Sequence, residues 1–269
     1  MNNDKKILFI GAGVMAEGII RGLTKNNTVK AKNIGILDIN KQRIDYMKKV
    51  YGVLSFDNIK ICAKDFEYII IAVKPKNIEE VLEELNNLIS NNVIISIVAG
   101  KSIEEMTNII GVNKKVVRVI PTPFIEGENG LNILFTNDNL IKSELDFVER
   151  IFKSIGEIVY LPEKQFNNYT GFGSAACGAF ILEYIESMVD AGVRTGFSRK
   201  QSEEFVLSSI MSVVKTIMKT GEHPAIIKNK MSSPAGVTIE GLYELNNGNF
   251  RAILQSAVEK SVEKANNLI

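Results

Sequence analysis

The stretch Ile7-Leu8-Phe9-Ile10-Gly11-Ala12-Gly13-Val14-Met15-Ala16 decides the fold of this chain. Its four leading apolar residues predict a short strand that is buried on both faces. The spacing Gly-x-Gly-x-x-Ala follows at once and opens a helical pattern, as in a βαβ phosphate-binding turn. The first glycine permits the tight bend, and the second lets the backbone approach a pyrophosphate. We therefore predict that a dinucleotide binds at Gly11, Ala12, Gly13, Val14 and Met15; a glycine-rich turn without a ligand is the alternative.

The rest of the first half alternates apolar runs with helical patterns. The runs are rich in β-branched residues and fall at 34–37, 68–73, 93–98 and 116–120. Between them, apolar residues recur at helical spacing, for example at positions 78, 81, 82, 85 and 88. This alternation predicts an α/β domain with a parallel sheet and right-handed crossovers. The segments 131–135 and 157–161 are expected to add edge strands, and Gly156 is expected to end the helix before it.

After Pro162 the strand pattern stops. Helices are predicted at 179–192, 198–220, 237–245 and 250–268. The part of the second helix at 205–218 is apolar on more than one side, so it needs more partners than this tail offers. We therefore predict an α/β protein with an N-terminal NAD(P)-binding Rossmann domain (1–162) and a C-terminal all-helical dimerisation and substrate domain (163–269).

Residues that follow the predicted strands are candidates for the rest of the dinucleotide site, because ligands of open α/β sheets lie beyond the carboxyl ends of the strands. Asp38 stands where a ribose-reading acid is expected and favours NADH, although it could instead cap the next helix. Asn40, Lys41 and Arg43 follow at once and could hold the 2′-phosphate of NADPH. The choice between NADH and NADPH therefore stays open. Further candidates are Ala72, Val73, Lys74, Pro75, Ala99 and Gly100.

Composition excludes several classes of function. Lys and Arg total 32 and Asp and Glu total 31, so the net charge of +1 argues against a nucleic-acid platform. One histidine (His223) and two cysteines (Cys62 and Cys177) cannot build a Cys/His zinc site, and no metal is expected. No apolar stretch reaches 18 residues, so we expect no membrane partner. Few cysteines and no signal-peptide pattern predict a cytoplasmic protein.

Several motifs together resemble the pyrroline-5-carboxylate reductase family. In the first half they are residues 9–16, Ala72-Val73-Lys74-Pro75, 96–100 and 118–123. In the tail they are Asp190-Ala191-Gly192-Val193-Arg194, Thr220-Gly221-Glu222-His223-Pro224, residues 232–239 and Gly248-Asn249-Phe250-Arg251. The tail motifs are specific, whereas the glycine turn alone occurs in many enzymes. The resemblance implies hydride transfer from NAD(P)H to the C=N carbon of 1-pyrroline-5-carboxylate, which gives L-proline.

The resemblance also implies a homodimer or a higher assembly, with the substrate between the nicotinamide and the partner's helical domain. By motif, Ser233, Gly236, Val237 and Thr238 would hold the substrate, and the Thr238 hydroxyl would lie near the ring nitrogen as the catalytic group. The backbone amides of the segment 234–238, which opens a predicted helix, could bind the substrate carboxylate. His223, next to Pro224, is expected to end one helix and turn the chain.

This sequence departs from the family pattern at three places. The family usually has Asn at Val14, and it has a loop one residue longer than Pro121-Thr122-Pro123. The segment 172–178 reads as one residue longer than its counterpart. A reductase of another cyclic imine and a non-catalytic dinucleotide-binding homologue therefore remain alternatives to the leading prediction.

Overall fold

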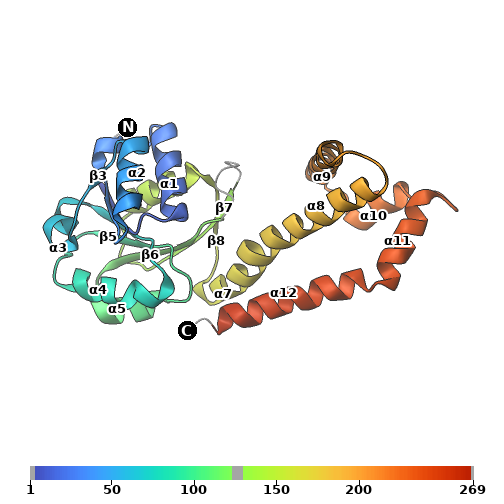
Figure 1. Cartoon of the computed structure of the whole chain (residues 1–269). Coiled ribbons are helices and arrows are strands. Elements are labelled where there is room, and N and C mark those ends of the chain that lie inside the picture. Colours follow the sequence, from blue (N-terminus) through green and yellow to red (C-terminus); the bar gives the residue numbers. More distant parts are fainter. Residues whose placement is uncertain (1–3, 123–129, 268–269) are drawn as a thin grey trace. The chain divides into compact units, whose positions relative to one another are not determined.

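The computed structural model describes residues 4–122 and 130–267, and its contacts divide the chain into two compact units. The first unit runs to Ser174 and includes the last residues from Val262 on (Figure 1). The second unit is Ala175–Ser261. The first unit thus contains the predicted domain 1–162 and extends into the helical segment after it.

The first unit is built on one eight-stranded sheet with the order β3-β2-β1-β4-β5-β6-β7-β8. The predicted strands are confirmed, and all neighbours pair in parallel except β6 and β7, which are antiparallel. The strands are β1 Ile7–Ile10, β2 Ile34–Leu37, β3 Leu54–Ser55, β4 Tyr68–Ile71, β5 Val93–Ser96, β6 Lys115–Ile120, β7 Gly130–Thr136 and β8 Gly156–Tyr160.

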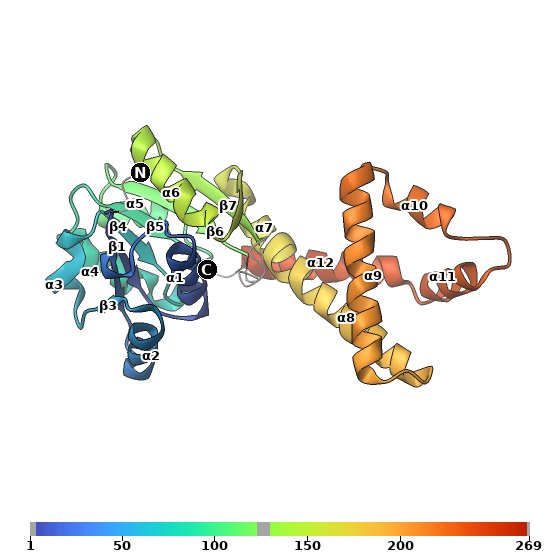
Figure 2. The same ribbon diagram turned by 90° about the horizontal axis from the view of Figure 1, so that it is seen from above.

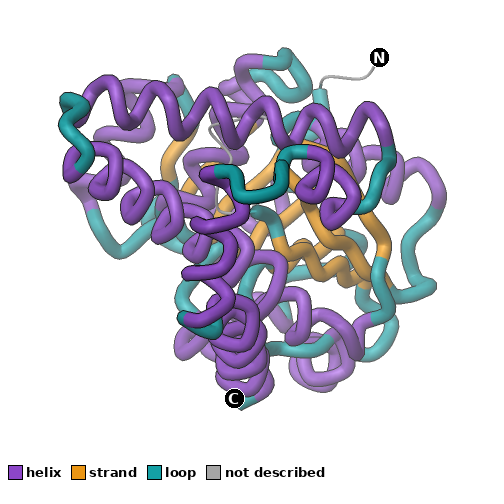
Figure 3. Tube along the Cα trace, turned by 90° about the vertical axis from the view of Figure 1, so that its right-hand side faces the viewer, coloured by secondary structure: helices purple, strands orange, loops and turns teal. Residues whose placement is uncertain are grey.

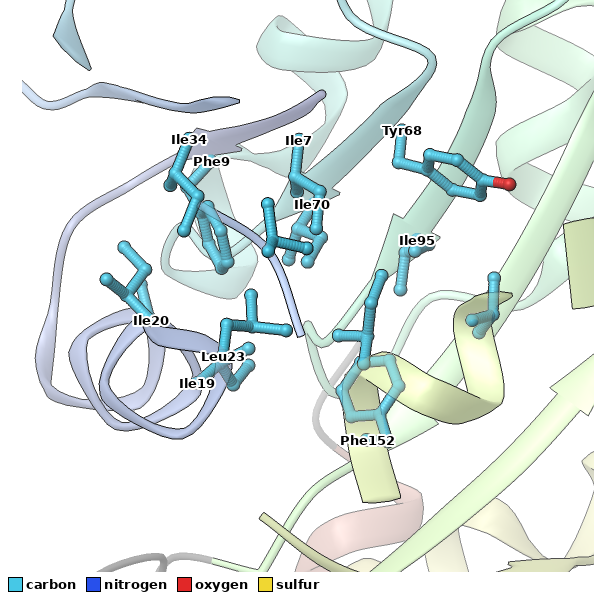
Figure 4. Packing of buried hydrophobic residues seen from close by; sticks show 14 of the residues in the cluster. Ile7, Phe9, Ile19, Ile20, Leu23, Ile34, Tyr68, Ile70, Ile95 and Phe152 are labelled. Atoms are coloured by element: carbon cyan, nitrogen blue, oxygen red, sulfur yellow. The ribbon is translucent and has the colours of Figure 1, made fainter. Parts of the chain in front are cut away.

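Helices cover both faces of the sheet (Figure 3). Two clusters of buried apolar side chains fill the space between the sheet and these helices. Ile7 and Phe9 of β1 point to one face and pack with Ile19, Ile20 and Leu23 of α1 (Figure 4). The alternate residues of β1 point to the other face, toward α3, α4 and α5. Both faces are apolar because the crossovers of a parallel sheet place helices on each side. The helices of this unit are α1 Val14–Lys25, α2 Lys41–Tyr51, α3 Ile59–Cys62, α4 Ile78–Asn86, α5 Ile103–Ile110, α6 Lys142–Lys153 and α7 Phe166–Tyr169.

Two local predictions in this unit are wrong. The segment 131–135 was expected at an edge, but β7 lies between β6 and β8, and β8 alone forms that edge. Gly156 does not end a helix, because α6 already ends at Lys153 and Gly156 begins β8. At φ +155°, a Cβ on Gly156 would lie 2.0 Å from the Gly130 carbonyl oxygen, so this glycine permits the close pairing of β7 and β8.

The second unit is helical, as predicted, and α8 and α9 pack against each other (Figure 2). Ser198 caps α9 in a capping box with Gln201, and Gly221 ends that helix in the left-handed conformation. A π-helical segment, Thr170–Ala176, leads into α8. The helices are α8 Cys177–Arg194, α9 Arg199–Thr220, α10 Pro224–Lys230, α11 Val237–Asn247 and α12 Phe250–Asn266, which continues into the first unit.

The faces of α9 are largely exposed in the single chain. Large apolar side chains along it are 45% exposed or more: Phe205, Leu207, Met211, Val213, Val214 and Met218. Within the described parts of the chain, Glu163–Arg194 is also the one helical stretch long and apolar enough to cross a membrane by length and composition. That stretch carries Glu183, Glu186, Asp190 and Arg194, whose spacing places a charged stripe along α8. A helix of this kind has an apolar side that needs a partner and a polar side that faces water.

Candidate active site

The residues predicted to bind the dinucleotide meet at one edge of the sheet. The Gly11 amide donates to the Leu37 carbonyl at 2.8 Å, and the Ala72 amide donates to Ile10 at 2.8 Å. The chain segments that follow β1 and β4 are therefore hydrogen-bonded to the neighbouring strands at the carboxyl ends of β2 and β1. Across β5, the Ile97 amide donates to the Ile71 carbonyl at 3.1 Å, so the segment leading to Gly100 starts beside β4.

The two glycines of the turn have different tasks. Gly11 has φ +98°, and a Cβ there would lie 2.5 Å from the Ala72 carbonyl oxygen. Gly13 has ordinary φ, and nothing lies within 4 Å of the place where its Cβ would be. Gly13 is also the N-cap of α1, and no side chain caps that helix. A helix start with free amides beside open space fits the pyrophosphate of a dinucleotide, so the residues present suit the group that the sequence predicts.

The other turn residues differ in exposure. Ala12 and Ala16 are fully buried, Met15 is half-buried, and Val14 is 83% exposed. An exposed valine offers only an apolar surface where a polar residue could have met a ligand. Val14 therefore leaves the backbone amides, rather than side chains, as the polar groups of this turn.

Lys74, Pro75, Ala99 and Gly100 lie beyond β4 and β5 at the same edge. Lys74 is exposed and precedes the 3₁₀ turn Pro75–Asn77. Gly100 has φ +91°, a conformation that glycine favours. Two residues later Ser102 caps α5 in a capping box with Glu105. These residues shape the edge through the backbone, because their side chains are small, rigid or turned to solvent.

Asp38 does not cap α2. The N-cap is Asn40, whose side chain accepts from the Arg43 amide at 3.2 Å. One Asp38 carboxylate oxygen accepts from the Ala12 amide at 2.7 Å, and the other accepts from the Asn40 amide at 2.8 Å. The acid at the end of β2 is thus tied to the glycine turn itself, at the place where a ribose is read in such folds.

Glu17 collects three donors one turn into α1, a cluster that sequence reasoning missed. Arg43 donates to one carboxylate oxygen, and the Tyr46 and Tyr51 hydroxyls each donate to the other at 2.9 Å. Burial opposes the charge of Glu17, but the hydrogen bonds from Arg43, Tyr51 and Tyr46 outweigh it and hold its pKa below the ordinary value. Burial and the bond to Glu17 raise the pKa of Tyr51 to about 12. Glu17 is therefore ionised at neutral pH.

The predicted substrate residues lie together at the start of α11, in the second unit. Gly236 is the N-cap of α11 and has no side-chain cap. A Cβ on Gly236 would lie 2.3 Å from the Ser233 hydroxyl, so this hydroxyl sits directly beside the helix start. Val237 is 91% exposed and Thr238 is half-buried. Free amides, a serine and a threonine in one place can bind a carboxylate and donate to a nitrogen.

His223 begins a helix, which corrects the prediction that it ends one. Its Nδ1 accepts from the Ala225 amide at 3.2 Å, and Pro224 takes the first helical position of α10. The preceding helix α9 has already ended at Gly221. His223 thus has a structural partner. Among the described residues, no group of three His, Cys, Asp or Glu side chains could hold a metal.

Arg118 begins the motif at 118–123, but no role of its own was predicted for it from the sequence. It is 5% exposed on β6, donates to Glu163 at 2.8 Å and lies 4.8 Å from the Phe166 ring centre. The same Glu163 oxygen accepts from the Ile103 amide at 2.7 Å. This buried ion pair joins β6, the start of α5 and the segment before α7. The loop Pro121-Thr122-Pro123, which is shorter than the family pattern, is described only as far as Thr122, and Pro123 lies outside the described residues.

Comparisons with known proteins agree over the whole chain. Residues 163–268 match the family model described as pyrroline-5-carboxylate reductase dimerisation. Residues 6–100 match one described as NADP oxidoreductase, coenzyme F420-dependent. A pyrroline-5-carboxylate reductase of Methanosarcina acetivorans is 31% identical over 267 residues, with 98% of each chain covered. The chain belongs to the pyrroline-5-carboxylate reductase family.

Other members of the family support the same assignment. The Arabidopsis thaliana reductase is 30% identical, with 98% of this chain and 95% of the relative covered. The crystal structure of the Plasmodium falciparum reductase with NADP bound has a TM-score of 0.90 at 29% identity, and 98% of each chain is covered. The Streptococcus pyogenes reductase also has a TM-score of 0.90, at 25% identity and with 99% and 100% covered. The fold predicted from the sequence is therefore confirmed.

Proposed function

We propose that this chain reduces 1-pyrroline-5-carboxylate to L-proline with NAD(P)H, the last step of proline biosynthesis. The observation that carries this conclusion is the full-length likeness to reductases of that name, which spans both units. The geometry supports it: a glycine-opened helix start suits a pyrophosphate at Gly13, and a second one suits a carboxylate at Gly236.

The chemistry requires few ionisable side chains. A reduced nicotinamide held at this edge would supply a hydride to the C=N carbon, and a proton from water, passed through a hydroxyl to the ring nitrogen, would complete the secondary amine. We assign the substrate carboxylate to the free amides at the start of α11 and to Ser233. The Thr238 hydroxyl then lies two residues into the same helix, where it donates to the ring nitrogen. Positioning and hydrogen-bond donors are sufficient for such a step, and no acid–base pair is needed.

The roles of the cofactor residues follow from their places at the sheet edge. The amides of Val14 and Met15 receive the pyrophosphate, and Gly13 leaves room for it. Asp38 and Asn40 lie at the ribose. The backbone of residues 72–75 and 99–100, beyond β4 and β5, lines the part of the site that receives the nicotinamide half of the cofactor. These assignments are proposals that rest on the open Gly13 position and on the edge geometry.

We further propose that the chain works as a homodimer through the second unit. The exposed apolar side chains of α9, and those beside the charged stripe of α8, support this, since water contact with such an area is unfavourable. The match of residues 163–268 to a dimerisation family supports it too. We assign the protein to the cytoplasm because both cysteines are free thiols, one of them exposed, which suits a reducing compartment.

The direct test measures the oxidation of NADH and NADPH at 340 nm with 1-pyrroline-5-carboxylate, with product analysis for proline. Rapid oxidation that yields proline in equal amount is expected. Cofactor binding without oxidation would refute the assignment of the substrate. The same assay with larger cyclic imines would then separate a related reductase from a non-catalytic homologue.

A further inference from the structure

Arg43 is the cation best placed to read the adenosine ribose, but its side chain is already engaged. Its Nε donates to the Ala12 carbonyl, and its Nη2 donates to Glu17 and, at 3.4 Å, to the Gly13 carbonyl. The guanidinium carbon also lies 5.0 Å from the Tyr46 ring centre. The side chains of Arg43 and Glu17 are only 24% and 16% exposed, so solvent screens this ion pair less than a surface pair.

Two tyrosines as well as Arg43 fix the position of the Glu17 carboxylate. Tyr46 and Tyr51 donate to the carboxylate oxygen that Arg43 does not use, and this fixes the carboxylate against the guanidinium. A 2′-phosphate would have to compete with an ionised, positioned carboxylate for the same arginine. A cation in that state is largely neutralised for any incoming anion.

The remaining charges near the ribose do not favour a 2′-phosphate. Among the described contacts, the Asp38 carboxylate accepts from two backbone amides and pairs with no cation. A carboxylate there accepts from a 2′-hydroxyl but repels a 2′-phosphate. Asn40 uses its side-chain oxygen to cap α2. Lys41 is exposed, so water screens its charge.

We propose that the Glu17–Arg43 ion pair, together with Asp38, gives this reductase a preference for NADH over NADPH. Glu17 withdraws Arg43 from the 2′ position, and Asp38 accepts from the hydroxyl that only NADH has there. NADPH remains a weaker cofactor, because both dinucleotides share the pyrophosphate site. This inference rests on the proposed function only in taking NAD(P)H as the cofactor.

The test measures the dissociation constants of NADH and NADPH by nicotinamide fluorescence, without any imine substrate. The wild-type protein is expected to bind NADH about tenfold more tightly than NADPH, a difference of ~1.4 kcal/mol. Glu17→Gln keeps an acceptor for the two tyrosines but removes the charge. It is expected to raise NADPH affinity relative to NADH by about tenfold, because Arg43 becomes free to meet a phosphate. Because no imine is present, failure to make proline would leave this result unaffected.

A double-mutant cycle of Glu17→Gln with Arg43→Gln tests whether the change in cofactor ratio acts through Arg43. Arg43→Gln alone is expected to weaken both cofactors together, because the carbonyls of the turn lose a donor, and to leave their ratio unchanged. In that background Glu17→Gln should no longer change the ratio. Asp38→Ser is an independent variant that should also shift the ratio toward NADPH if a Glu17 variant folds poorly, as judged by circular dichroism.

Three outcomes would overturn the proposal. The first is tighter binding of NADPH than NADH by the wild-type protein. The second is a selective loss of NADPH affinity in Arg43→Gln alone, which would show that Arg43 already holds the 2′-phosphate. The third is an unchanged ratio in both folded Glu17→Gln and folded Asp38→Ser.

Discussion

Alanine at Gly11 and alanine at Gly13 should have opposite consequences, although the two glycines are two residues apart. At Gly11 the backbone has φ +98°, which costs an L-residue about 1–2 kcal/mol. The new Cβ would also lie 2.5 Å from the Ala72 carbonyl oxygen, a backbone atom at the end of β4. Ordinary van der Waals contact needs ~3.4 Å, so the strand end must move by ~0.9 Å, and such overpacking costs roughly 1–3 kcal/mol.

The expected loss for Gly11→Ala is therefore about 3 kcal/mol, which lowers the melting temperature by roughly 6–12 °C for a unit of this size. Gly13→Ala meets no atom within 4 Å and keeps an ordinary φ. Its melting temperature should stay the same or rise slightly, because alanine restricts the unfolded chain. Its methyl group, however, would stand at the proposed pyrophosphate site, so the dissociation constant for NADH should rise about tenfold, or ~1.4 kcal/mol.

Thermal melts with and without NADH separate these effects, since a ligand that binds only the folded state raises the melting temperature by an amount set by its affinity. Gly11→Ala should melt early in both conditions. Gly13→Ala should melt normally without NADH and should lose most of the upward shift that NADH gives the wild-type protein. Equal destabilisation by the two variants, or an unchanged NADH shift in Gly13→Ala, would refute the division of tasks between these glycines.

Three further predictions concern the substrate segment, the assembly and the buried ion pair. Thr238→Ala should lose at least about tenfold in kcat while its NADH dissociation constant is unchanged, because the hydroxyl acts only on the ring nitrogen; normal turnover would remove Thr238 from the mechanism. Met211→Asp should shift the sedimentation coefficient to that of a monomer, whereas Lys200→Asp, in the first turn of the same helix, should not; a dimeric Met211→Asp would contradict an interface on α9. Arg118→Met should lower the free energy of unfolding by ~2–3 kcal/mol, because it leaves the Glu163 carboxylate unpaired at a largely buried place. Adding Glu163→Gln should recover part of that loss, as seen in urea melts; simply additive losses would contradict a coupled pair.

The sequence predicted the central strands because their burial is uniform. All residues of β1, β4 and β5 are buried, and the runs are apolar apart from Tyr68 and Ser96. The two-residue strand β3 gave no such signal, since Leu54 is 45% exposed. The direction of β7 and its place between β6 and β8 could not be predicted from the sequence pattern, because the pattern shows that a strand exists but not which neighbours it pairs with. The seven-residue α10 was missed although Pro224 stands at its first position, where proline is favoured.

The candidate site also contains residues that the sequence predicted and residues that it could not predict. The glycine turn was predictable because a Cβ at Gly11 would lie 2.5 Å from the Ala72 carbonyl oxygen, so the backbone demands glycine there. The residues at the start of α11 were instead implied by the family resemblance, and the structure adds that the Ser233 hydroxyl lies where a Cβ on Gly236 would stand. The Glu17–Arg43 pair was not predictable, since 26 residues separate its members and only the packing of α1 beside α2 brings them together. Sequence reasoning placed Arg43 near the ribose and left the cofactor open. The structure adds the partner that changes what this arginine can do: a cation next to a ligand site binds an anion only to the extent that the protein has not already neutralised it.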